Sequence, residues 1–217
     1  MNPEALSQGL AAYLCVVLIV TVHEFGHAWM ASRCGDDTAR SQGRVTLNPL
    51  AHIDMLGTVI IPLLMIVLTS TGQGRLAGFL IGWGKPVPVN PSYFRHRVRD
   101  DILTAMAGPF MNVVLMVAAL MAARVAAFGN VDVVIEAGLQ MASISMYLFF
   151  FNLIPVPPLD GSHVLRHAVG MREETFLNFS RYGFFVVVVL IQIPLVRQFL
   201  GVATMTSVQV TWRLLGG

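Results

Sequence analysis

The stretch LAAYLCVVLIVTVHEFGHAW, residues 10–29, decides how this chain folds. Leu10 to Val22 carry no charged side chain, and the polar motif HEFGH follows without a break. About 20 apolar residues make one helical crossing of a bilayer, so we expect a membrane helix over residues 9–33. Glu24 then lies at membrane depth, where an ionisable group is energetically costly and indicates a function.

The composition of the whole chain agrees with a protein embedded in the lipid bilayer. Of its 217 residues, 55% are hydrophobic and 12% are charged, about half the charged share of soluble domains. This length accommodates roughly five crossings with short connections, which predicts one membrane-embedded domain over residues 1–217. The formal net charge is +2 and no basic cluster marks a nucleic-acid interface, so nucleic acid is not an expected partner.

The apolar runs predict an all-α polytopic membrane protein with about five transmembrane helices. We also expect a re-entrant or hairpin element at residues 55–84. A short extended segment is expected near residues 85–90, because the prolines of GWGKPVPVNP remove backbone donors and favour extended geometry. The apolar runs after the first helix cover residues 55–71, 76–83, 102–123, 137–159 and 182–196.

Charge placement predicts the orientation, since short cytoplasmic loops collect arginine and lysine. Placing the three basic loops in the cytoplasm requires residues 55–84 to enter the membrane and return. His27 and Asp160 then lie on the same side, toward the cytoplasm. The basic side chains are Arg33, Arg40 and Arg44 after the first helix, Lys85, Arg95, Arg97 and Arg99 before residues 102–123, and Arg166, Arg172 and Arg181 after residues 137–159.

The spacing within HEFGH is that of a metal-binding helix. His23 and His27 stand at positions i and i+4, one turn apart on one helical face, so both imidazoles can point at one ion. Zinc favours nitrogen ligands in a tetrahedral shell, and the HExxH pattern makes Glu24 the general base. The alternative is that the histidines only pair with Glu24 inside a helix bundle, which three polar side chains at membrane depth disfavour.

Two histidines leave a zinc ion short of a third protein ligand, and Asp160 is the best candidate. It lies in NLIPVPPLDG, residues 152–161, where three prolines break the helix and can turn the carboxylate inward. A surface turn is the alternative that an Asp-Gly pair often signals. Together with HEFGH, the sequence favours the ligand.

HEFGH and NLIPVPPLDG together resemble the site-2 protease family of intramembrane zinc metalloproteases. The similarity covers roughly residues 20–165 and extends to GDD, GRVTLNPLAHID, GWGKPVPVNP and AGPFMN, which resemble the compact bacterial branch without a PDZ domain. The resemblance implies one Zn²⁺ per chain, held by His23, His27 and Asp160, with Glu24 as the catalytic base. It also implies a role for Asn152 near the scissile carbonyl. An Asn amide can donate to a developing oxyanion, but a helix-to-helix hydrogen bond explains Asn152 equally well.

The resemblance further implies an architecture and an activity. The family's three core helices correspond to residues 9–33, 102–123 and 137–159, within a catalytic core of about 9–165 that precedes a C-terminal helix and tail at 180–217. The implied activity is peptide-bond hydrolysis in or near transmembrane segments of membrane protein substrates, either as regulated intramembrane proteolysis or as clearance of signal-peptide remnants. The implied location is a prokaryotic inner membrane.

A rival function from another class uses the same ligands. A membrane zinc transporter or metal sensor would bind the ion transiently, with Glu24 relaying protons. Transport favours polar residues spread along a path across the membrane. Here the ionisable residues concentrate at one depth, which favours a site over a pathway.

Three further pairs of residues have structural explanations that we prefer to functional ones. For His52 and Asp54 we favour a loop turn before a helix over a metal contact. For His163 and His167 we favour a solvated helix face over a second metal site. For Gly108 and Asn112 we favour close helix packing over a direct role.

Overall fold

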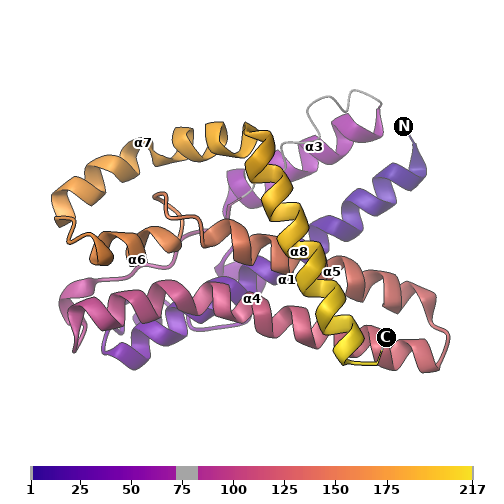
Figure 1. Cartoon of the computed structure of the whole chain (residues 1–217), viewed down its shortest axis with the longest axis horizontal. Coiled ribbons are helices and arrows are strands. Elements are labelled where there is room, and N and C mark those ends of the chain that lie inside the picture. Colours follow the sequence, from indigo (N-terminus) through magenta and orange to yellow (C-terminus); the bar gives the residue numbers. More distant parts are fainter. Residues whose placement is uncertain (1, 72–82, 217) are drawn as a thin grey trace.

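The computed structural model describes residues 2–71 and 83–216, and these residues form helices and turns without any strand (Figure 1). The segment at residues 83–90 lies outside any helix, in line with the expected extended segment near residues 85–90. The helices are α1 (Pro3–Cys34), α2 (Thr38–Ser41), η1 (Pro49–Ala51), η2 (Met55–Ile60), α3 (Ile61–Ser70), η4 (Pro91–Tyr93), α4 (Arg97–Phe128), α5 (Asp132–Asn152), α6 (Gly161–Ala168), α7 (Glu173–Gln192) and α8 (Pro194–Leu214).

Helix α1 extends beyond the expected span at residues 9–33, and each of its ends is set by a cap. The side-chain oxygen of Asn2 accepts the Glu4 N–H at 3.0 Å, and Pro3 occupies the first turn. At the other end Gly35 adopts a left-handed φ of 108°, and its N–H turns back to the carbonyls of Ala31 and Ser32.

Helices α1, α4 and α5 pack against one another and form the centre of the molecule, as expected for residues 9–33, 102–123 and 137–159. The approach of α1 to α4 is close at Gly26, where a Cβ would lie 2.7 Å from the Ala107 carbonyl oxygen. Helix α8 crosses α5 diagonally and lies in front of it in Figure 1. The apolar cluster at this crossing contains Leu120, Met146 and Val208.

Four of the described helices are long and apolar enough to cross a membrane: α1, α4, α5 and α7. The apolar run at residues 55–71 forms η2, with 6 residues, and α3, with 10 residues. Together they extend at most ~24 Å, which is less than the ~30 Å hydrocarbon core. The expected re-entrant element at 55–84 is described only in part, because residues 72–82, including most of the run at 76–83, lie outside the described residues.

Prolines interrupt the later helices within the apolar runs. The run at 137–159 stops being helical after Asn152, because Pro155, Pro157 and Pro158 cannot donate to a helical ladder. The run at 182–196 becomes two helices that divide at Pro194, which occupies the first turn of α8. Asp160 therefore lies on a turn between α5 and α6, next to the start of α6.

Candidate metal centre

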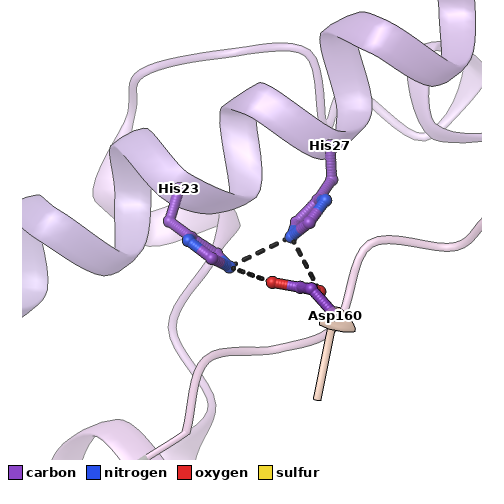
Figure 2. A group of neighbouring side chains, drawn as sticks. All are labelled: His23, His27 and Asp160. Carbon is purple, nitrogen blue, oxygen red and sulfur yellow. Dashed lines mark hydrogen bonds and ion pairs between the residues drawn. The ribbon is translucent and has the colours of Figure 1, made fainter. Parts of the chain in front are cut away.

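The three expected metal ligands lie together, although they come from distant parts of the sequence. Figure 2 shows His23 and His27 pointing from one face of α1 toward Asp160. The Nε2 atoms of the two imidazoles are 3.0 Å apart, and the Asp160 carboxylate oxygens lie 3.3 Å from His23 Nε2 and 3.4 Å from His27 Nε2. Among residues 2–71 and 83–216, this is the one group of three such side chains close enough to hold an ion.

The donor triangle has the dimensions of a zinc site. Zinc binds nitrogen and oxygen at 2.0–2.1 Å in a tetrahedron, which places two ligands about 3.3–3.4 Å apart. The three observed separations lie within a few tenths of an ångström of that edge. Asp160 Oδ2 is buried and has no hydrogen-bond partner among the described residues, and a buried carboxylate oxygen of this kind calls for a cation. The residues present therefore fit a zinc ion.

The tautomer of His27 is set by the neighbouring helix. His27 Nδ1 lies 2.8 Å from the Thr104 carbonyl oxygen in α4 and donates its hydrogen there. In the neutral ring this leaves the Nε2 lone pair directed at His23 and Asp160. Such an outer hydrogen bond is common behind zinc-binding histidines and fixes the orientation of the ring.

Asp160 is held in its ionised form. Burial raises the pKa of its carboxyl, but the positive charge that His27 and His23 carry when they are protonated outweighs burial and leaves the pKa well below its usual range. The side chain therefore carries a negative charge at neutral pH, as a metal ligand must.

Gly108 of α4 gives the two imidazoles the space that they occupy. A Cβ at this position would lie 2.3 Å from His27 Nε2 and 2.7 Å from His23 Nε2. Our expectation that Gly108 serves helix packing was therefore incomplete, since the atoms that it accommodates include two corners of the donor triangle, the Nε2 atoms of His23 and His27. No sequence pattern near Gly108 reveals this contact, because it depends on how α4 docks on α1.

Glu24 lies between the two histidines in α1, and the segment at residues 83–90 passes beside its carboxylate. Val87 N–H donates to Glu24 Oε2 at 3.2 Å. The buried Arg44 guanidinium binds the carbonyls of Lys85 and Pro86, and the Lys85 N–H donates to the His52 carbonyl at 2.9 Å. These contacts fix the segment and with it the donor that orients the Glu24 carboxylate.

The remaining candidate residues lie outside the donor triangle. His52 is buried with Nε2 on the Thr46 carbonyl, and Asp54 caps η2 through the N–H groups of Leu56 and Gly57, so both are structural, as expected. Asn152 ends α5 and is partly exposed, and its role near a scissile bond stays a prediction.

The comparison with known proteins decides the family. The model of peptidase family M50 matches residues 11–140 and 130–194. The chain belongs to this family. The resemblance to site-2 proteases is thereby confirmed, and the matched region contains His23, His27 and Asp160 of the M50 chain. With four apolar helices of membrane-spanning length among the described residues, the M50 chain is an integral membrane protein.

Several curated relatives have names that describe a zinc metalloprotease. The protein named "Putative zinc metalloprotease YwhC" of Bacillus subtilis is 36% identical over 86% of this chain and 83% of its own length. "Putative zinc metalloprotease Rip2" of Mycolicibacterium smegmatis is 29% identical over 82% of this chain, and its counterpart in Mycobacterium tuberculosis is 31% identical over 71%. The chain spans 65% and 54% of those two relatives. No solved structure matches the chain.

Proposed function

We propose that this M50 chain is an intramembrane zinc metalloprotease that hydrolyses peptide bonds in or near transmembrane segments of membrane proteins. The observation that carries the proposal is the triangle of His23, His27 and Asp160 beside Glu24 on a membrane-spanning helix. The matching family and the names of the relatives support the same activity.

In this proposal, His23, His27 and Asp160 hold one Zn²⁺. When bound, the ion supplies Lewis-acid activation of water and of the scissile carbonyl. The Glu24 carboxylate accepts a proton from the attacking water and returns it to the leaving amine. The Val87 N–H orients the Glu24 carboxylate, because it donates a hydrogen bond to Oε2. The Asn152 amide is proposed to donate to the substrate near the scissile bond.

We further propose that the active site faces the cytoplasm in a prokaryotic inner membrane. The Arg95 N–H donates to the Cys34 carbonyl at 3.1 Å, which joins the site-proximal ends of α1 and α4. Exposed arginines, Arg33, Arg97 and Arg99 among them, gather at this end, as the positive-inside rule predicts for cytoplasmic loops. An impermeant thiol reagent should then label Ser92→Cys only in inverted vesicles, and Val133→Cys only in intact cells stripped of their outer wall. The reverse pattern would place the site outside.

The decisive experiment compares the wild type with Glu24→Gln and Asp160→Ala in detergent. Zinc content and cleavage of a transmembrane test substrate are measured on the same samples. We expect Glu24→Gln to keep zinc and lose cleavage, and Asp160→Ala to lose zinc. Glu136→Gln is the matched control, since it makes the same chemical change at an exposed position in the first turns of α5.

The same proteins also test the rival function. If the wild type holds zinc, cleaves none of a broad panel of transmembrane substrates and moves zinc across proteoliposomes, the chain is a transporter and the protease proposal is wrong. Cleavage that survives in Glu24→Gln would remove Glu24 from the role of general base.

A further inference from the structure

A second cluster of ionisable side chains lies outside the metal centre. His163 Nδ1 lies 3.2 Å from both carboxylate oxygens of Asp101, and His167 Nε2 lies 2.6 Å from one of them. Asp101 belongs to α4 and is 4% exposed, whereas the histidines stand one turn apart on α6. The expectation of a solvated helix face is therefore wrong for His167, whereas the side chain of His163 is 32% exposed. The described residues hold no second group of metal-binding side chains there, as expected.

The geometry of this cluster is that of hydrogen bonds and not of metal coordination. The 2.6 Å between His167 Nε2 and Asp101 Oδ2 is shorter than the ~3.3 Å that separates two ligands of one zinc ion. A carboxylate only accepts, so each imidazole donates an N–H to Asp101. Two charge-assisted hydrogen bonds thus connect α6 to α4.

The position of α6 bears directly on the metal centre. Asp160 immediately precedes Gly161, the first residue of α6, and the turn before it carries three prolines and no regular hydrogen-bond ladder. A carboxylate on such a turn is placed by the elements that flank it. The docking of α6 is therefore one of the contacts that place Asp160 relative to α1, alongside the close approach of Gly183 in α7 to Pro157.

The same turn of α4 also contacts the metal centre directly, through His27. Thr104, whose carbonyl binds His27 Nδ1, lies three residues after Asp101 and thus on the same side of the helix. Zinc–ligand distances lie within about 0.2 Å of their standard values, so each ligand has to be placed accurately. One turn of α4 thus contacts His27 through Thr104 and helps to position Asp160 through Asp101 and α6.

We propose that Asp101 is a positioning residue of the metal centre, which fixes α6 through His163 and His167 and so holds Asp160 opposite His23 and His27. Burying a carboxylate costs free energy, and apolar contacts would join two helices at least as stably. Directional bonds to two imidazoles set the register of α6 on α4, which apolar contacts do not. This inference rests on the metal centre of the proposed function.

The test measures metal affinity of the purified full-length chain by chelator competition, with Zn²⁺ and with Co²⁺ as a spectroscopic probe. We expect Asp101→Ala to lower zinc affinity 10–100-fold, as for other residues behind metal ligands, and to change the Co²⁺ absorption spectrum. Glu173→Gln is the control. It removes the ion pairs of Glu173 with Arg97 and Arg166, which also join α4 and α6 to α7, but it leaves Asp101 untouched. Its zinc affinity should stay within twofold of the wild type.

Further variants keep the test decisive if Asp101→Ala does not fold. Asp101→Asn preserves the shape of the side chain and His167→Ala removes one bond, and each should lower zinc affinity by a smaller factor. A merely structural Asp101 would lower the melting temperature of the metal-free chain and leave zinc affinity and the Co²⁺ spectrum unchanged, which would overturn the inference. If the wild type itself binds no zinc, the proposed function falls as well.

Discussion

Replacing Gly108 by alanine should separate metal binding from folding. The added Cβ would lie 2.3 Å from His27 Nε2, 2.5 Å from His27 Cε1 and 2.7 Å from His23 Nε2. To reach ordinary van der Waals contact, the nearest ring atom must retreat by roughly 1 Å. That shift is several times the ~0.2 Å that a zinc–ligand distance tolerates. The methyl group therefore occupies space that the Nε2 atoms of His23 and His27 need to form the donor triangle.

The expected loss of affinity follows from this displacement. Removing a residue that only supports a ligand typically lowers metal affinity 10–100-fold. Moving the ligand itself should cost at least ~100-fold in zinc affinity, or about 2.7 kcal/mol. The fold should survive, because alanine stabilises a helix interior by about 0.5–1 kcal/mol relative to glycine and the imidazoles can swing aside when no metal is bound.

Competition with a chromophoric chelator measures zinc affinity, and thermal unfolding of the metal-free chain measures the fold. Gly201→Ala in α8 is the matched control, since nothing lies within 4 Å of a Cβ at that position. It should gain the same helix stability and keep wild-type zinc affinity. Wild-type zinc affinity in Gly108→Ala would refute the placement of the two imidazoles against α4.

Three further predictions concern the 83–90 segment and the ion. Val87→Pro removes the N–H that binds Glu24; such a bond to a charged group contributes ~1.5–3 kcal/mol, so steady-state kinetics should show kcat falling at least tenfold while zinc content holds. Arg44→Gln leaves the carbonyls of Lys85 and Pro86 short of donors, so hydrogen exchange at residues 83–90 should accelerate with zinc affinity unchanged; protection equal to the wild type would show that Arg44 does not hold the segment. Chelation should lower the melting temperature of the wild type, since free zinc at 100 times its Kd stabilises a folded chain by ~2.7 kcal/mol; Asp160→Ala should show no such shift.

The donor triangle of His23, His27 and Asp160 could be predicted from the sequence because its signals are local. The i, i+4 spacing places His23 and His27 on one face wherever the helix lies. Asp160 followed from the need for a third donor and from prolines that end the preceding helix. The structure brings all three together with ligand atoms 3.0–3.4 Å apart.

The supporting residues could not be predicted because their signals are not local. Every residue carries a carbonyl, so nothing in the sequence marks the one at Thr104 as the partner of His27. The pairing of Asp101 with His163 and His167 depends on how α6 docks. Helix ends were missed for a related reason: α7 begins at Glu173 and not near residue 182, because hydropathy follows the lipid boundary, whereas a helix continues into water.

The metal centre joins the beginning of the chain to its last third, and this has a consequence for biosynthesis. A ribosome delivers α1 to the membrane long before it reaches the turn that carries Asp160, since synthesis proceeds from the N-terminus. Until then the nascent chain holds two imidazoles and no carboxylate to complete the triangle. The donor triangle is therefore complete only after α1, α4 and α5 have all been made, and in the proposed protease a chain that ends before Asp160 lacks one of the three zinc ligands.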